Sequence, residues 1–224
     1  MTSISKFRAA IFDLDGTLLD TLDDLGDSTN AVLAGRGYAA HPMESYKTFV
    51  GGGARVLIER ALAASLGEPA PAELVDELLA DFKAEYKKRW NVKTRPYDGI
   101  AELLADVDGL GLRCAILSNK PHAFTCLCVE ASFAAGRFEV VQGVDDSTPP
   151  KPDPAGIAKI LSDWGIDASD VVYLGDTGVD MATASAAGCY AVGVTWGFRG
   201  RDELLANGAD VIIDSPAKLA TILR

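Results

Sequence analysis

The sequence is poor in the residues on which several classes of enzyme depend. Its 224 residues include only two histidines, His41 and His122, and neither stands in an Arg-His-Gly context. None of its four cysteines begins a Cys-x5-Arg loop, and their spacing matches no metal-binding pattern. We expect all four to be small, buried side chains. Cysteine-dependent phosphatase chemistry is therefore excluded, and any catalysis must depend mainly on carboxylates, hydroxyls and amines.

Long apolar runs and an excess of positive charge are also missing. No stretch approaches the roughly 18 to 20 apolar residues that a membrane span requires, and residues 1–6 are too polar and too short for a signal peptide. The formal net charge of −11 offers no basic surface to nucleic acid or to an anionic membrane. We therefore expect a cytoplasmic monomer or homodimer whose partner is a small molecule. A phosphorylated partner would need a metal or a few well-placed cations.

From residue 95 onward, apolar strands alternate with helices. Such alternation implies right-handed crossovers and a parallel sheet, with the binding site in the loops at the carboxyl ends of the strands. Strands are predicted at 112–117, 138–144, 171–174, 190–194 and 211–213, and helices at 100–107, 121–133, 154–164, 179–187, about 202–206 and 217–223.

Between residues 21 and 94 the pattern is helical throughout. The clearest helix, 71–90, has large apolar residues at steps of four, which is typical of a packing face. Further helices are predicted at 21–36, 42–49 and 54–65. We therefore predict an α/β core formed by residues 1–20 and 95–224, and an α-helical domain formed by residues 21–94.

An apolar run at residues 9–12 leads into two acids, Asp13 and Asp15. A turn after Asp13 can bring both carboxylates into one pocket, where they repel each other unless a cation or a shared proton is present. Gly16 supplies backbone freedom, and its amide with that of Thr17 could face an anion. Taken alone, such a pair is more often two solvated acids in a turn, because short carboxylate pairs are common on surfaces.

Two polar clusters follow later strands. Ser118 and Asn119 lie between the predicted strand 112–117 and Pro121, where a hydroxyl and helix-start amides could hold a phosphate. Ser118 could also be a simple helix cap. Lys151 stands between two prolines that stiffen its backbone, as a phosphate clamp requires, although a surface lysine in a proline turn would look the same.

A last acidic pair, Asp176 and Asp180, follows the predicted strand 171–174. The two acids are four residues apart and share one face of a helix start, where they could merely balance the helix dipole. Together with Asp13 and Asp15 they would form an all-oxygen cluster of the kind that Mg²⁺ prefers.

These four clusters, in this order, resemble the four motifs of the haloacid dehalogenase superfamily. Residues 12–21, Phe-Asp-Leu-Asp-Gly-Thr-Leu-Leu-Asp-Thr, resemble the first motif of its phosphatases. The resemblance covers nearly the whole chain. It implies a Rossmann-like parallel sheet core with a small α-helical cap domain inserted after the first strand. Dehalogenases of the superfamily lack an equivalent of Asp15, so its presence favours phosphoryl chemistry.

The resemblance also implies roles for the motif residues. Asp13 would be the nucleophile that forms an aspartyl phosphate, and Asp15 would protonate the leaving oxygen and then deprotonate water. Mg²⁺ would be held by the Asp13 carboxylate, the Asp15 main-chain carbonyl and Asp176, with Asp180 supporting them. The phosphoryl group would be held by Gly16, Thr17, Ser118, Asn119 and Lys151.

The helical insert resembles the cap of the phosphoglycolate phosphatase group, most closely at residues 49–55. We hypothesise that Gly51, Gly52 and Gly53 form a loop that approaches the core closely, and that Arg55 pairs with a substrate carboxylate or second anion. Arg55 could equally be a solvated helix residue. The group commonly has Asn in place of Gly52, which leaves the choice of substrate open.

We expect a Mg²⁺-dependent phosphatase acting on 2-phosphoglycolate. The alternatives are a phosphatase for another small metabolite, such as a sugar phosphate, a nucleotide or pyrophosphate, and a sugar phosphomutase. A phosphate-binding regulatory module without turnover is a further alternative of a different class.

Overall fold

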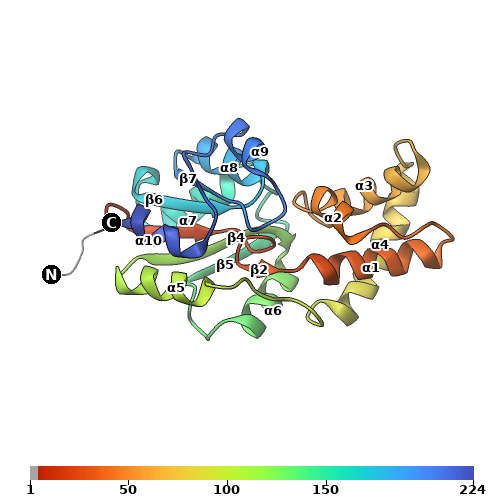
Figure 1. The fold of residues 1–224 in the computed structure, drawn as a ribbon, viewed down its shortest axis with the longest axis horizontal. Helices are drawn as coiled ribbons and strands as arrows, with labels where there is room; N and C mark the ends of the chain where they lie inside the picture. The colour runs from red at the N-terminus through yellow and green to blue at the C-terminus, as the bar shows by residue number, and fades with distance from the viewer. Residues whose placement is uncertain (1–4) are drawn as a thin grey trace.

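A six-stranded parallel sheet lies at the centre of the computed structural model, which describes residues 5–224 (Figure 1). The strands lie in the order β5-β4-β1-β6-β7-β8. The chain leaves β1 towards β4 and β5, then crosses to β6, so the switch in direction lies beside β1, where crevices for ligands open. The six strands of the sheet are β1 (Ala9–Phe12), β4 (Arg113–Pro121), β5 (Val140–Val144), β6 (Val171–Gly175), β7 (Tyr190–Val194) and β8 (Val211–Ile213).

Helices cover both faces of the sheet, because alternate residues of each strand point to opposite sides. Ala10 and Phe12 pack with α5 (Ile100–Gly109), α6 (His122–Ser132) and α10 (Leu219–Leu223). Ala9 and Ile11 pack with α7 (Ala155–Trp164), α8 (Gly178–Ala187) and α9 (Arg201–Ala206). Two short 3-10 helices, η1 (Ala168–Asp170) and η2 (Pro216–Lys218), complete this part of the chain. The predicted α/β class is therefore confirmed.

Four helices form a separate lobe beside the sheet, which we call the helical lobe (Figure 1). They are α1 (Leu22–Gly35), α2 (Met43–Phe49), α3 (Ala54–Leu66) and α4 (Ala72–Arg89). The lobe has its own apolar core, to which α4 contributes Val75, Leu78, Phe82 and Tyr86. The spacing of these four residues places them on one side of α4.

The two crossings between sheet and lobe run side by side. Here β2 (Leu19–Asp20) pairs with β3 (Arg95–Pro96) in an antiparallel two-residue ladder that the sequence pattern did not predict. Just beyond, the buried Asp24 carboxylate accepts hydrogen bonds from the main-chain N–H groups of Val92, Lys93 and Thr94 at 2.8–3.1 Å, and from the Thr94 hydroxyl at 2.8 Å. The start of α1 is thus tied to the segment that returns to the sheet.

Several predicted boundaries shift. Strand β4 continues to Pro121 instead of ending at residue 117, and its pairing with β5 is irregular between Leu117 and Pro121. Ser118 and Asn119 therefore lie on the end of a strand, and not at a helix start. The cysteine prediction is wrong for Cys126, which is partly exposed, whereas the other three are buried. Within residues 5–224, no helix is both long and apolar enough to cross a membrane.

Candidate active site

The four motifs meet at the carboxyl edge of the sheet. Asp13 follows β1, Ser118 lies near the end of β4, and Asp176 follows β6. The main-chain N–H of Asp13 donates to the Leu174 carbonyl at 2.9 Å, which fixes the end of β1 against the end of β6. Lys151 reaches the same edge from the loop before α7, where its ammonium meets the Asp13 carboxylate. Residues that are far apart in the sequence therefore surround one point.

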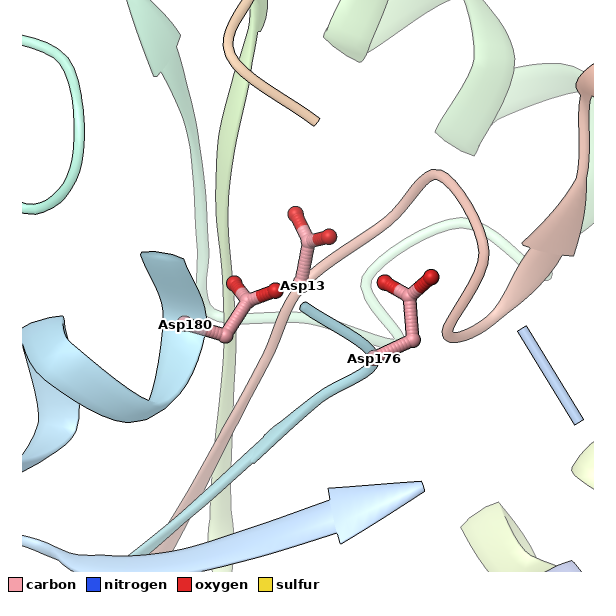
Figure 2. A group of neighbouring side chains, drawn as sticks. All are labelled: Asp13, Asp176 and Asp180. Carbon is pink, nitrogen blue, oxygen red and sulfur yellow. The ribbon is translucent and has the colours of Figure 1, made fainter. Parts of the chain in front are cut away.

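Three carboxylates converge there, from Asp13, Asp176 and Asp180 (Figure 2). Each offers an oxygen, and these oxygens all lie within 4.8 Å of one another. All three residues are buried, with exposed fractions of 6%, 0% and 1%. Such proximity of buried acids requires positive charge nearby.

Lys151 supplies one positive charge within the cluster. Its Nζ donates to Asp13 Oδ1 at 2.7 Å and to Asp180 Oδ1 at 2.6 Å, and it also reaches the Tyr173 hydroxyl at 3.2 Å. Burial alone would lower the pKa of this ammonium, but the two carboxylates outweigh burial and hold the pKa well above its ordinary value. Lys151 is therefore a permanent cation.

One ammonium does not balance three carboxylates. Burial, reinforced by the Asp180 carboxylate, raises the pKa of Asp13 to about 7. Burial, with the charges of Asp180 and Asp13, also raises the pKa of Asp176 well above its ordinary value. A divalent cation would remove this excess of negative charge, and an all-oxygen donor set suits Mg²⁺. The residues present therefore fit a bound Mg²⁺.

Asp180 is already occupied by protein partners. Its Oδ1 accepts from Lys151 and from the Tyr173 hydroxyl, the latter at 3.1 Å. Its Oδ2 accepts from the Thr177 N–H at 3.1 Å and the Thr177 hydroxyl at 2.6 Å. Asp180 is thus better placed to orient Lys151 and to cap α8 than to bind an ion directly.

Sequence reasoning missed Tyr173 and Thr177. A tyrosine in the otherwise apolar strand 171–174 was a readable signal, because a buried hydroxyl needs a partner. Thr177 followed by Asp180 three residues later is a capping-box pattern that the structure bears out.

Asp176 is held by two groups from other segments. Its Oδ2 accepts from the Phe198 N–H at 2.7 Å, and its Oδ1 accepts from the Thr17 hydroxyl at 3.3 Å. Gly16 lies against the same carboxylate with a φ of +86°, and a Cβ at this position would overlap Asp176 Oδ2. Only glycine satisfies both the backbone angle and the close approach.

The expectation that the amides of Gly16 and Thr17 face an anion needs correction. The Gly16 N–H donates to the Leu19 carbonyl at 2.8 Å, and the Thr17 N–H donates to the Leu14 carbonyl at 3.3 Å. Both amides are used within the turn itself. Gly16 and Thr17 therefore shape the site around Asp176 and do not present their amides to a ligand.

Asp15 lies beside a buried lysine that the sequence analysis gave no role. Lys120 Nζ contacts Asp15 Oδ1 at 2.9 Å and Oδ2 at 3.0 Å. Burial would lower the pKa of Lys120, but Asp15 outweighs burial and raises it. The ammonium lies over the face of the Tyr86 ring, 5.0 Å from its centroid. The orientation of the Asp15 carboxylate is thereby fixed.

The Asn119 side chain acts as a strut between loops. Its Oδ1 accepts from the Lys151 N–H at 2.7 Å, and its Nδ2 donates to the carbonyls of Lys151 at 3.1 Å and Gly51 at 3.2 Å. Because both its oxygen and its nitrogen already have partners in the protein, the Asn119 side chain has little hydrogen-bonding capacity left for a ligand. Ser118 differs, because its Oγ accepts from the Lys120 N–H at 3.2 Å but finds no acceptor for its own proton within residues 5–224.

A pocket leads from Asp13 and Asp15 into the space between the sheet edge and the helical lobe. Apart from the acids, lysines and short polar side chains, its lining is mainly apolar and aromatic. The lining residues are Asp13, Asp15, Leu25, Val50, Gly51, Gly53, Ala54, Leu57, Phe82, Lys83, Tyr86, Ser118, Asn119, Lys120, Pro121 and Phe124.

Two predicted contributors from the lobe do not line this pocket. Gly52 is not among the lining residues, unlike its neighbours. Arg55 is absent from the lining too, because its guanidinium pairs with Asp76 at 2.5 Å and with Glu59 at 3.2 Å. The expectation that Arg55 pairs with a substrate anion is therefore not supported by its position.

Comparison with known proteins gives a consistent result. The model of the haloacid dehalogenase-like hydrolase family matches residues 10–194. An N-acetylmuramic acid 6-phosphate phosphatase of Pseudomonas aeruginosa is 35% identical over 219 residues, which are 97% of this chain and 95% of the relative. A phosphoglycolate phosphatase of Mesorhizobium japonicum is 38% identical over 191 residues, 85% of this chain and 84% of the relative. The crystal structure of a candidate phosphoglycolate phosphatase from Lactobacillus delbrueckii subsp. bulgaricus has a TM-score of 0.91 at 33% identity, covering 97% of this chain and 98% of that one.

Proposed function

Because the chain belongs to the haloacid dehalogenase-like hydrolase family and is a phosphatase of that family, we propose that it hydrolyses a small phosphomonoester with Mg²⁺, through an aspartyl phosphate on Asp13. The observation that carries this proposal is the meeting of Asp13, Lys151 and Asp176 beside a pocket that Asp13 and Asp15 line.

Mg²⁺ would be held by the Asp13 carboxylate, the Asp15 main-chain carbonyl and Asp176. When bound, the ion offsets the charge on the phosphoryl oxygens and on the acids that hold it. Lys151 and the Ser118 hydroxyl bind phosphoryl oxygens, and Asn119 keeps Lys151 in position. Charge stabilisation of this kind supplies much of the rate enhancement in phosphoryl transfer.

The reaction has two steps. An oxygen of the ionised Asp13 carboxylate forms a bond to phosphorus as the bond from phosphorus to the ester oxygen breaks, and Asp15 gives its proton to that leaving oxygen. Water then attacks phosphorus while Asp15 takes up a proton, which frees inorganic phosphate and restores Asp13. Lys120 holds the Asp15 carboxylate in the orientation that both proton transfers require.

Residues 21–94 act as a cap domain that encloses the leaving group. Support comes from contacts between the helical lobe and the rest of the chain: Asn119 donates to the Gly51 carbonyl, and Arg199 Nη2 donates to the carbonyls of Val50 at 2.8 Å and Thr48 at 3.3 Å. The paired crossings β2 and β3 are the place about which such a cap would move.

Two substrates are candidates. The first is 2-phosphoglycolate, which the resemblance of residues 49–55 and the names of several relatives support. The second is N-acetylmuramic acid 6-phosphate, the substrate in the name of the relative from P. aeruginosa. The pocket of this chain offers a second argument for it. The apolar wall formed by Leu25, Leu57, Phe82 and Phe124 suits a larger leaving group than glycolate.

The test is phosphate release with Mg²⁺ across a panel that includes both compounds, sugar phosphates, a nucleotide and pyrophosphate. The Asp13→Asn variant is the control and should lower the rate by at least about a thousandfold. Preference for one candidate, abolished in the variant, would support the mechanism and that substrate. If no ester releases phosphate, the proposal is refuted and a binding module without turnover takes its place.

A further inference from the structure

One cation on the cap side of the pocket has no role in the chemistry described so far. We infer that Lys83 binds a carboxylate on the leaving group of the substrate and so selects carboxylated phosphoesters. This inference rests on the proposed function, because it assigns a specificity residue to the same pocket.

The charges around the pocket point to Lys83. Lys120 is neutralised by Asp15, Lys151 by Asp13 and Asp180, and Arg55 by Asp76 and Glu59. Lys83 lines the pocket, yet no carboxylate of residues 5–224 lies within 4.0 Å of its Nζ. In a chain with a net charge of −11, an exposed lysine that lines a substrate pocket without an acid beside it is available to an anion.

The position of Lys83 relative to Asp15 indicates which part of the substrate it contacts. Phe82, Lys83 and Tyr86 lie on one stretch of α4 and all line the pocket. The Tyr86 ring contacts the ammonium of Lys120, which in turn holds Asp15, the group that protonates the leaving oxygen. Lys83 therefore lies on the side of the pocket that the leaving group occupies.

Tyr86 shapes the wall beside Lys83. Its side chain is buried and lines the pocket, and its hydroxyl has almost no accessible surface, so the residue adds to the apolar wall and not to the polar groups that a substrate meets. An apolar wall with one ammonium thus suits a leaving group that carries a single carboxylate. The flexible four-carbon stem of lysine can follow carboxylates at different distances.

The experiment compares matched pairs of substrates. N-acetylmuramic acid 6-phosphate and N-acetylglucosamine 6-phosphate differ by the lactyl ether that bears the carboxylate. In the pair 2-phosphoglycolate and 2-hydroxyethyl phosphate, a carboxylate is replaced by a hydroxymethyl group. For each pair, kcat and KM are measured for the unaltered protein and for Lys83→Ala, Lys83→Arg and Lys83→Glu.

We expect Lys83→Ala to lower the ratio of kcat/KM for the carboxylated over the neutral partner by about tenfold, mainly through KM. Lys83→Arg should recover most of the ratio, and Lys83→Glu should lower it further than alanine does. The preference of the unaltered protein should also weaken as ionic strength rises. The matched control is Lys87→Ala, which removes an exposed lysine one turn further along α4 that does not line the pocket.

The outcomes separate this inference from the proposed function. If the unaltered protein releases phosphate but Lys83→Ala leaves the ratio within twofold of its original value in both pairs, the inference is refuted alone. If Arg55→Ala lowers the ratio of kcat/KM and Lys83→Ala does not, then Arg55 binds the carboxylate and the inference is refuted. If no ester is hydrolysed at all, the proposed function fails and the inference fails with it.

Discussion

The buried carboxylate of Asp24 should contribute more to stability than any surface charge of the helical lobe. The perturbation is Asp24→Ala, which removes the acceptor of four donor groups: the main-chain N–H groups of Val92, Lys93 and Thr94 and the Thr94 hydroxyl. These donors belong to the segment that carries the chain back from α4 to the sheet. Their loss therefore loosens the junction between the lobe and the core.

The size of the effect follows from the contacts. Hydrogen bonds to a charged acceptor contribute about 1.5–3 kcal/mol each, and four would give a large sum if no other partner were available. Residues 91–93 are exposed, however, so water replaces part of what the donors lose. We expect a loss of about 3 kcal/mol in the free energy of unfolding. For a chain of this length such a loss lowers Tm by about 6 to 12 °C. Asp24→Asn keeps one acceptor oxygen and should lose about half as much.

The assay is thermal and urea-induced unfolding followed by circular dichroism, with Asp23→Ala as the matched control. Asp23 is its neighbour in the first turn of α1 and is half-exposed, and within residues 5–224 its one ion pair is with Lys93 at 3.9 Å. Removing such a surface pair changes stability by less than about 1 kcal/mol. If Asp24→Ala unfolds within 0.5 kcal/mol of Asp23→Ala, the junction is not held by this carboxylate and the reasoning is wrong.

Three further predictions concern the site. Gly16→Ala should lower phosphate release by at least about a hundredfold and abolish the rise in Tm on adding Mg²⁺, because a Cβ would displace Asp176; an unchanged rise contradicts this. Without metal, burial and then Asp180 raise the folded-state pKa of Asp13 from 3.8 to about 7. The folded protein therefore binds more protons than the unfolded chain between these pH values, and its stability should decline as pH rises through this window. Because Mg²⁺ binds the ionised carboxylate, the gain in Tm from Mg²⁺ should be larger at pH 8 than at pH 5. Tyr173→Phe removes a hydroxyl that contacts Lys151 and should lower kcat about tenfold with little change in KM, whereas a change confined to KM would show that the contact is not catalytic.

The parallel sheet and the position of the site could be predicted because both depend on local patterns. Strand 190–194 is found with the predicted bounds and 171–174 with one residue more, since apolar runs bounded by turns fix buried strands. Carboxyl ends of parallel strands share one edge, so acids that follow strands must come close to one another. That argument needs only the order of elements, which periodicity supplies.

Other features depend on tertiary placement and have no local signal. The two-residue strands β2 and β3 pair residues about 75 positions apart, and Asp24 meets donors about 70 positions later. Arg55 could have faced the substrate, but its partner Asp76 lies on another helix, and only the packing of α3 against α4 decides between them. Lys120 was visible in the sequence, but its pairing with Asp15 follows from the extension of β4 beyond residue 117.

The contrast between the two sides of the pocket has a physical cause. The groups that we propose to act on the phosphoryl centre lie at the ends of strands or, like Lys151, in a loop at the same edge of the sheet. Their order and spacing in the sequence were enough to recognise them. Groups that contact the leaving group come from the lobe, where Lys83 lies between Phe82 and Tyr86 of the buried stripe on α4. Its place beside that stripe puts it at the border of the packed face, and helical periodicity does not tell whether such a border faces solvent or a pocket. The docking of the lobe over Asp15 decides this, which is why the residue that we propose selects the substrate lies at the edge of a stripe interpreted as packing alone.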